Sequence, residues 1–336
     1  MNDERIVLAH GGGGSLGHRL LDEVVRPELS NPVLEELADS AVVSFSGARL
    51  AFTTDSFVVK PLFFRGGDIG RLAVSGTVND LAVSGAKALW LSLGLVIEEG
   101  FLIENLRRIM RSVHRTAGEA GVQVVCGDTK VVGRGEADGL FVSTSGIGVV
   151  PEGVKLSPAS ARPGDAVIVN GPLGEHGIAI MSEREGISFE TPIISDVAPL
   201  GGLIETIFAA GAEIHVMRDP TRGGVASALN EIAASSGVTI TLSEPDVPVS
   251  PVVAAACDML GFDVLSVANE GKVLVVCPES SARQVLDAMQ AHPLGREAKV
   301  IGSAGEPRGV GLVLKTSVGG QRIVDMPYGE ALPRIC

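Results

Sequence analysis

Apolar positions along the chain follow two periodicities, one typical of helices and one typical of strands. From Leu102 to Ala120 apolar residues recur at helical spacing, and Gly121 suits a helix end. Short apolar runs such as Ala88 to Ile97 have the length of a buried strand. In the first half of the chain these patterns predict strands at 41–45, 50–54, 88–97, 122–126 and 140–150, and helices at 68–85 and 102–120.

The second half repeats the mixture after a stretch rich in Pro, Gly and Ser between Pro151 and Pro163, which predicts a domain boundary. The predicted elements there are strands at 166–170, 238–242, 272–276 and near Val300 and Val313, and helices at 175–184, 199–210, 224–236, 251–260 and 280–291. Helices and strands alternate without a strict β-α-β rhythm, which favours an α+β fold with mixed sheets. We therefore expect four segments: a glycine-rich start and helix (1–40), two domains (41–155 and 156–325) and a mobile tail (326–336).

Composition narrows the class of protein. The chain has 336 residues with 45% hydrophobic residues, enough for two cores. Its net charge of -13 argues against a nucleic-acid ligand, which needs clustered Lys and Arg. The first residues do not resemble a signal peptide, and the longest apolar run is about half of the ~20 residues that span a membrane. We expect a cytoplasmic enzyme.

The four cysteines form no Cys-x-x-Cys pair, which argues against a metal knuckle or a thioredoxin-like site. Cys126, Cys257 and Cys277 lie in apolar patterns and are predicted to be reduced core residues. Cys336 is the last residue, and the stretch before it carries two prolines and a glycine, which oppose regular structure. Such a tail could carry a nucleophilic thiol; the alternative is an arbitrary last residue.

A glycine-rich loop, Gly11, Gly12, Gly13 and Gly14, leads into the first helix. Its backbone N–H groups could approach a phosphate, and a plain N-terminal turn is the alternative.

Acidic residues stand at the ends of several predicted elements. They are Asp55, Asp80, Asp128 in Gly127-Asp128-Thr129-Lys130, and Asp219 in Arg218-Asp219-Pro220-Thr221-Arg222-Gly223-Gly224. Carboxylates with neighbouring hydroxyls and glycine turns are what Mg²⁺ with a nucleoside triphosphate requires. Singly, each has a structural alternative: Asp219 could cap a helix and Asp128 could belong to a turn.

Two further groups have open roles. Glu270, beside a glycine turn, could be a general base, a ligand or an exposed turn carboxylate. His176, His215 and His292 show no metal-ligand spacing and are expected to be surface or hydrogen-bonded residues.

Together these motifs resemble the aminoimidazole-ribonucleotide-synthetase-like (PurM-like) ATP-dependent enzymes. The resemblance covers essentially the whole chain. The motifs that carry it are Thr53-Thr54-Asp55-Ser56, Asn79-Asp80-Leu81-Ala82, Gly127-Asp128-Thr129 and Asp219-Pro220-Thr221-Arg222-Gly223-Gly224. The His10-Gly11 start and the Pro333-Arg334-Ile335-Cys336 end are similar to one branch, the HypE family of carbamoyl dehydratases of hydrogenase maturation.

The resemblance implies two PurM-like α+β domains and a homodimer formed through the sheet of the first domain. It also implies roles for individual residues. Asp55, Asp80 and Asp219 would bind Mg²⁺, and the residues around ATP would be Gly11, Gly12, Gly13, Gly14, Asn79, Asp128, Thr129 and Thr221.

The implied reaction uses the tail. Cys336 would receive a carbamoyl group from the carbamoyltransferase HypF, and ATP would dehydrate the S-carboxamide to an S-cyanide. The cyanide would pass to the HypC–HypD complex for [NiFe]-hydrogenase. Lys130 and Glu270 are the two candidates for the base, and the sequence leaves the choice open.

Other functions remain as alternatives. A selenophosphate synthetase would carry Cys or selenocysteine with Lys in the glycine-rich start, where this chain has His10 and Ser15. A purine-pathway ligase or a thiamine-phosphate kinase would not need Cys336. An ATP-regulated scaffold and a dinucleotide-binding dehydrogenase are the more distant possibilities.

Overall fold

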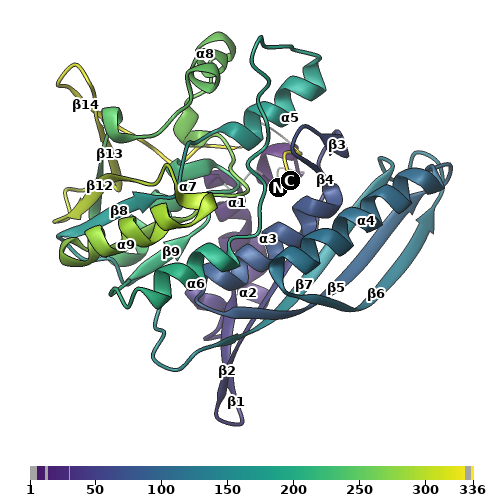
Figure 1. The fold of residues 1–336 in the computed structure, drawn as a ribbon, viewed down its shortest axis with the longest axis horizontal. Helices are drawn as coiled ribbons and strands as arrows, with labels where there is room; N and C mark the ends of the chain where they lie inside the picture. The colour runs from purple at the N-terminus through teal and green to yellow at the C-terminus, as the bar shows by residue number, and fades with distance from the viewer. Residues whose placement is uncertain (1–5, 12–13, 30, 330–333) are drawn as a thin grey trace.

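The computed structural model describes residues 6–11, 14–29, 31–329 and 334–336. Two α+β halves lie side by side, each with its own mixed sheet (Figure 1). This arrangement confirms the predicted α+β class and excludes the doubly wound parallel sheet that a dinucleotide-binding dehydrogenase would need.

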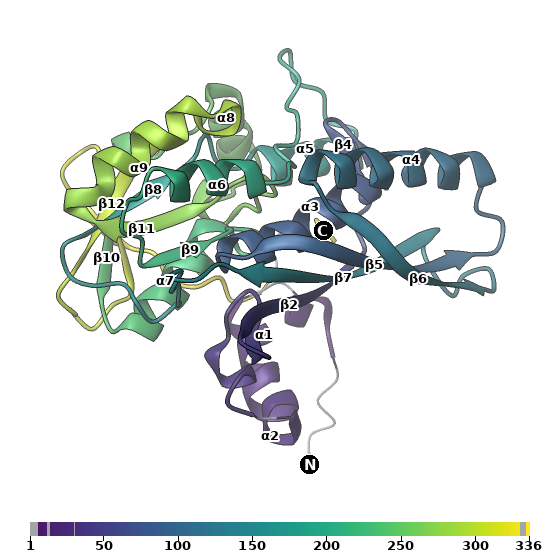
Figure 2. The same cartoon turned by 60° about the horizontal axis from the view of Figure 1, so that its bottom comes forward.

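The first half is built on a five-stranded sheet with two helices on one face (Figure 2). The strand order is β1 (Ala41–Phe45), β2 (Ala48–Phe57), β7 (Leu140–Val150), β5 (Lys87–Glu98) and β6 (Gln123–Val132). The helices are α3 (Ile69–Val83) and α4 (Ile103–Ala120). Neighbouring strands are antiparallel except β5 and β6, which are parallel.

Local chemistry sets the limits of these helices. The side chain of Asp68 accepts hydrogen bonds from the backbone N–H groups of Gly70 and Arg71, at 2.8 and 3.0 Å, and so caps the start of α3. Gly121, with φ of 69°, ends α4 in the left-handed conformation that glycine adopts without strain. The start of α3 at Ile69 and the end of α4 at Ala120 lie within two residues of the predicted limits, 68 and 120.

The opposite face of this sheet carries exposed apolar side chains. Phe52, Ile147 and Trp90 are register partners across β2, β7 and β5, and they are 46%, 37% and 48% exposed. In Figure 2 no helix of the described chain covers this face over β5 and β6. Contiguous exposed apolar side chains commonly mark an interaction surface.

The second half is built on a seven-stranded sheet covered on both faces. The strand order is β14 (Gln321–Ile323), β13 (Leu312–Lys315), β10 (Thr239–Ser243), β12 (Lys299–Gly305), β8 (Asp165–Val169), β11 (Leu274–Pro278) and β9 (Val216–Arg218). The helices are α5 (Glu175–Glu185), α6 (Gly201–Ala209), α7 (Gly224–Ser236), α8 (Pro251–Leu260) and α9 (Glu279–Ala291). Helices α6 and α9 pack on one face of the central strands and α7 on the other, so β8 and β11 are buried along their length.

Shorter elements complete the chain. They are η1 (Leu8–Gly11), α1 (Ser15–Leu20), η2 (Leu21–Val25), α2 (Arg26–Leu29), η3 (Leu34–Glu36), the β3–β4 hairpin (Phe63–Phe64 and Gly67–Asp68), η4 (Glu244–Asp246), η5 (Val264–Ser266) and η6 (Pro293–Gly295). Among the described helices, none is long and apolar enough to cross a membrane.

The structure departs from the predicted pattern at β6 and Cys126 and follows it at Cys257 and Cys277. Strand β6 continues through Asp128 to Val132, so the Gly127-Asp128-Thr129-Lys130 motif lies within a strand and not in a turn after it. Cys126 is exposed, and its prediction as a core residue was wrong, because β6 is the edge of the sheet. Cys257 and Cys277 are buried, as predicted.

Candidate functional site

A cavity of about 470 Å³ lies where the two halves meet the N-terminal segment. Its walls come from the start of the chain, the segment before β1, strand β2 with helix α3, the segment before α7 with α7 itself, the segment before β11, and the last residue. The lining residues used below are Gly11, His18, Asp39, Asp55, Asp80, Arg218, Asp219, Thr221, Arg222, Glu231, Glu270 and Cys336.

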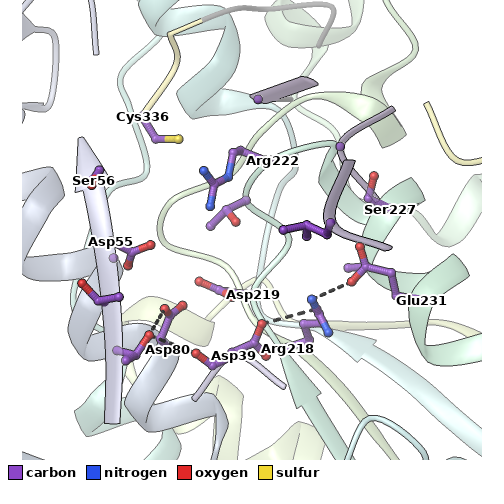
Figure 3. A pocket seen from close by; sticks show the side chains of 18 of the residues that line it. Asp39, Asp55, Ser56, Asp80, Arg218, Asp219, Arg222, Ser227, Glu231 and Cys336 are labelled. Atoms are coloured by element: carbon purple, nitrogen blue, oxygen red, sulfur yellow. Dashed lines mark hydrogen bonds and ion pairs between the residues drawn. The ribbon is translucent and has the colours of Figure 1, made fainter. Parts of the chain in front are cut away.

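Three carboxylates form a cluster on one wall of the cavity (Figure 3). One oxygen of each of Asp39, Asp80 and Asp219 lies within 4.8 Å of the others. Thr53, which points from β2, donates a hydrogen bond to Asp80 at 2.8 Å. This spacing allows one cation to contact all three carboxylates, and oxygen donors suit Mg²⁺.

The cluster is electrostatically unfavourable without a cation. Burial first, and then the carboxylate of Asp39, raise the pKa of Asp219 to about 8. Burial, followed by the charges of Asp55, Asp219 and Asp39, raises the pKa of Asp80 well above its ordinary value. A divalent cation would stabilise the ionised forms of both side chains, so these residues fit a metal site.

Asp39 was not predicted. It precedes β1, where no pattern distinguishes it from other polar turn residues, and it ion-pairs with Arg218 at 3.4 Å. Arg218 also contacts Glu231 at 2.6 Å, and Glu231 contacts His18 at 3.0 Å. This chain of contacts ties the N-terminal segment to the second half beside the acidic cluster. Figure 3 shows the contacts of Arg218 with Asp39 and Glu231.

Asp55 lies next to the cluster but outside the group of three. Burial raises the pKa of Asp55, and the guanidinium of Arg222 opposes that rise. Arg222 in turn has a raised pKa, first because of Cys336 and then because of Asp55 and Glu270. Arg222 therefore connects the acidic wall to Cys336 electrostatically.

Cys336 lies at the edge of the cavity, and its sulfur points toward Arg222 (Figure 3). Its backbone oxygen accepts a hydrogen bond from the N–H of Val58 at 3.0 Å, and the preceding Ile335 is only 1% exposed. In this structure the thiol is therefore docked at the acidic cavity and not directed away from the protein. The mobility of the tail stays a prediction.

Glu270 is buried, which is inconsistent with the alternative of an exposed turn carboxylate. Its side chain is 3% exposed, and its Oε1 has no hydrogen-bond partner within the described chain. Burial, then the charges of Asp219 and Asp196, raise the pKa of Glu270 well above its ordinary value. A carboxyl group with a raised pKa can take or give a proton near neutral pH.

Several predicted nucleotide ligands do not line the cavity. Asn79 uses its side-chain amide to join the halves: it donates to the carbonyls of Ala198 and Glu270, at 3.1 and 3.3 Å, and accepts from the N–H of Leu200 at 2.7 Å. Asn79 is thus an interdomain tie in this structure. Gly11 and Thr221 do line the cavity, as expected.

The glycine-rich loop is described only in part. Gly12 and Gly13 lie outside the described residues. Gly14 is buried against the tail segment, where a Cβ would lie 2.2 Å from the carbonyl oxygen of Pro327. Gly14 is required there by close packing, whatever its part in binding.

Asp128, Thr129 and Lys130 are exposed on edge strand β6 and do not line this chain's cavity. Lys130 contacts Asp128 at 2.9 Å, and Lys130 is the register partner of Val96 on β5. Side chains of register partners point to the same face, and Val96 is 36% exposed, so Lys130 belongs to the uncovered side of the sheet.

Comparison with known proteins gives the family. The family model of AIR synthase related proteins matches with its N-terminal domain at residues 37–150 and its C-terminal domain at residues 162–315. Carbamoyl dehydratase HypE of Rhizobium leguminosarum bv. viciae is 50% identical, covering 99% of this chain and 95% of that protein. The same protein of Escherichia coli (strain K12) is 43% identical, covering 98% and 99%.

Solved structures agree. A chain in the crystal structure of a HypE–HypF complex is 48% identical with a TM-score of 0.87, covering 92% of this chain and 99% of that one. HypE in complex with ATP is 42% identical with a TM-score of 0.83, covering 99% and 100%. The chain therefore belongs to the HypE carbamoyl dehydratase family, within the AIR synthase related proteins.

Proposed function

We propose that this chain dehydrates a carbamoyl group carried on the thiol of Cys336, at the expense of ATP, and so forms an S-cyanide. One observation carries the proposal: Cys336 lines the same cavity as the acidic cluster of Asp39, Asp80 and Asp219. A group bound to the sulfur would meet a phosphate bound at the cluster. The names of the relatives, carbamoyl dehydratase, support this reading.

The reaction can be written with all atoms accounted for. The amide oxygen of the S-carboxamide attacks the γ-phosphorus, the bond to ADP breaks, and one N–H proton leaves, which gives an iminophosphate. The C–O bond then breaks and releases phosphate, and loss of the second N–H proton leaves the nitrile on sulfur. Phosphorylation is needed because an amide oxygen is a poor leaving group.

Asp39, Asp80 and Asp219 would hold Mg²⁺, and Asp55 would be an additional ligand on the same wall. Bound there, Mg²⁺ would neutralise the charge of the transferred phosphoryl group. Gly11 and Thr221 line the adjoining cavity and would contact the nucleotide. That a HypE structure contains ATP supports a nucleotide in this cavity.

Glu270 is the base that this chain supplies to its own cavity. It is buried there, and its Oε1 has no hydrogen-bond partner in the described chain. Arg222, which interacts with both Cys336 and Glu270, would orient the thiol-borne group toward it. Lys130 would need to come from a second chain.

A homodimer would meet that need. The uncovered face of the first sheet carries Phe52, Trp90 and Ile147, and Lys130 lies toward the same side at the edge strand. Two such faces packed together would bury the apolar row. Each chain would then present the side chains of Asp128 and Lys130, with the backbone of Thr129 between them, to the partner's cavity.

HypF as the carbamoyl donor and the HypC–HypD complex as the cyanide acceptor complete the proposal. A HypE–HypF complex is among the similar structures, which supports the first of these partners. A cytoplasmic location and the boundaries of the four segments stay predictions.

The test is intact-protein mass spectrometry after incubation with carbamoyl phosphate, the carbamoyltransferase, ATP and Mg²⁺. Carbamoylation should add about 43 Da, and dehydration should reduce the increment to about 25 Da as ATP is consumed. Cys336→Ser should show neither product yet still bind ATP. A stable adduct of about 43 Da with ATP present, or ATP turnover unaffected by Cys336→Ser, would instead favour a carrier or an ATP-regulated scaffold.

A further inference from the structure

A backbone oxygen of each of the last three residues accepts a hydrogen bond from the body of the protein. The carbonyl of Arg334 accepts from the N–H of Lys60 at 3.2 Å and from the guanidinium of Arg184 at 2.8 Å. The backbone oxygen of Cys336 accepts from the N–H of Val58 at 3.0 Å. The middle carbonyl, that of Ile335, accepts from a histidine.

That histidine is His176, in the first turn of α5. Its Nε2 lies 2.9 Å from the carbonyl oxygen of Ile335, and its Nδ1 lies 2.7 Å from Oγ of Ser195. His176 is fully buried, with its ring edge-to-face against Phe64 at 5.7 Å between centroids. Water therefore cannot easily replace this contact with the tail.

The surroundings of His176 select one tautomer. A carbonyl oxygen can only accept, so Nε2 must carry the hydrogen, and Nδ1 then accepts from the hydroxyl of Ser195. The same Ser195 oxygen accepts from the backbone N–H of Val197 at 3.2 Å, which orients the hydroxyl. Burial lowers the pKa of His176, although Asp196 and the Ile335 carbonyl oppose this, so the ring is neutral near pH 7.

We propose that His176, held by a hydrogen bond between its Nδ1 and Ser195, is a positioning residue that fixes the tail at Ile335 and so holds the Cys336 thiol in the cavity for dehydration. The inference rests on the proposed function. In this proposal His176 determines the balance between a docked thiol, which can react with the nucleotide, and a released thiol, which can reach a partner protein.

The latch, which is His176 with its partner Ser195, is connected to the candidate base Glu270 through the backbone. Ser195 is followed by Asp196, whose Oδ1 accepts from the backbone N–H of Glu270 at 3.2 Å. On the other side of His176, the N–H of Gly177 donates to the carbonyl of Ala268 at 3.1 Å. His176, which holds the tail, and Glu270, which would take the proton, are thus connected through two short segments, 195–196 and 268–270.

Modification of Cys336 by a maleimide carrying a bulky polyethylene glycol chain tests the latch without ATP or a partner protein. The reagent is too large for the cavity, so it should react with the released thiol only. All proteins carry Cys126→Ser, which removes an exposed thiol, while the buried thiols Cys257 and Cys277 report any unfolding.

Loss of the buried donor in His176→Phe should raise the modification rate of Cys336 about tenfold. His176→Gln places an amide N–H near the position of Nε2 and should stay within about twofold of the parent protein. Ser195→Ala removes the hydrogen-bond partner of Nδ1, which orients the ring, and should give an intermediate rate. An unchanged rate in His176→Phe, or a rate in His176→Gln as high as in His176→Phe, would overturn the proposal.

If His176→Phe exposes the buried thiols, Ser195→Ala and His176→Gln decide, because they remove or replace fewer atoms. A rate for Ser195→Ala equal to the parent rate would then refute the latch.

A second measurement separates the latch from the reaction. In single-turnover experiments on the carbamoylated chain, His176→Phe should slow dehydration by about the same factor, while its loading by the carbamoyltransferase should not slow. If the parent chain is loaded but never dehydrated, the proposed function fails, and the modification rates still judge the latch. Slower loading of the variant would show that His176 serves the partner and not the docked state.

Discussion

Replacing Asp219 with Asn should stabilise the metal-free protein at pH 8 and remove its stabilisation by Mg²⁺. The two effects have one cause. Asp219 is buried within 4.8 Å of the carboxylate oxygens of Asp39 and Asp80, so its charge is unfavourable alone and favourable with a cation. Asn keeps the shape and removes the charge.

The pKa values set the sign and the size of the effect. In the unfolded chain Asp219 loses its proton near pH 4, and in the folded chain its pKa is about 8. Between these values the folded state holds a proton that the unfolded state lacks, so the stability of the metal-free protein falls as pH rises. Each pH unit is worth about 1.4 kcal/mol, which limits the cost to about 5 kcal/mol, shared among the coupled carboxylates.

At pH 8 we therefore expect Asp219→Asn to gain about 2 kcal/mol over the parent, or a rise in Tm of about 5 °C. The gain should shrink as pH falls and vanish near pH 4, where the carboxyl group is protonated in both the folded and the unfolded parent. With Mg²⁺ in hundredfold excess over its Kd, the parent should gain about 2.7 kcal/mol and the variant should gain little.

The assay is thermal unfolding from pH 5 to pH 8, with EDTA and then with Mg²⁺. Asp246→Asn, at an exposed carboxylate in η4, is the matched control and should change neither profile. The reasoning fails if the difference in Tm between variant and parent does not grow with pH. It also fails if Mg²⁺ stabilises Asp219→Asn as much as the parent.

Three further substitutions test other parts of the structure. Lys130→Ala and Asp80→Asn should each be inactive. After subunit exchange in an equal mixture about half of the dimers are mixed, and one of the two sites in each mixed dimer is intact, so about a quarter of parental dehydration should return. No recovery would place Lys130 outside the partner's cavity. Lys272→Met leaves Asp196, at 2.9 Å, as a buried charge without this partner and should lower the free energy of unfolding in urea by about 3 kcal/mol or more. Gly271→Ala should shift the urea midpoint downward, since its Cβ would lie 1.9 Å from the carbonyl oxygen of Asp196.

Sequence patterns predicted the elements well wherever one residue determines a limit. Asp68 caps α3 and Gly121 ends α4, and both signals are local. Edge strand β6 was predicted too short because Asp128 and Lys130 interrupt its apolar run. The exposed edge of a sheet tolerates such charges, so hydrophobicity did not mark the end of the strand.

The candidate site was predicted in part for a different reason. Asp80 and Asp219 come together although they are distant in the chain, and the resemblance supplied that pairing. Asp39 was missed because its role depends on Arg218 and on the packing of the N-terminal segment, which no local pattern encodes. The resemblance implied Asn79 as a nucleotide ligand beside Asp80; in this structure one helical step turns its side chain to the interdomain contact.

The docked tail also has a consequence for kinetics. Because residues 334–336 hold the sulfur at the chain's own cavity, the proposed substrate is a tethered group, and its local concentration is independent of how much protein is present. Dehydration should therefore be first-order in loaded chain and unaffected by dilution as long as the dimer persists. Exchange with partners should remain second-order, so the supply of cyanide in dilute solution would be limited by encounters and not by the chemical step.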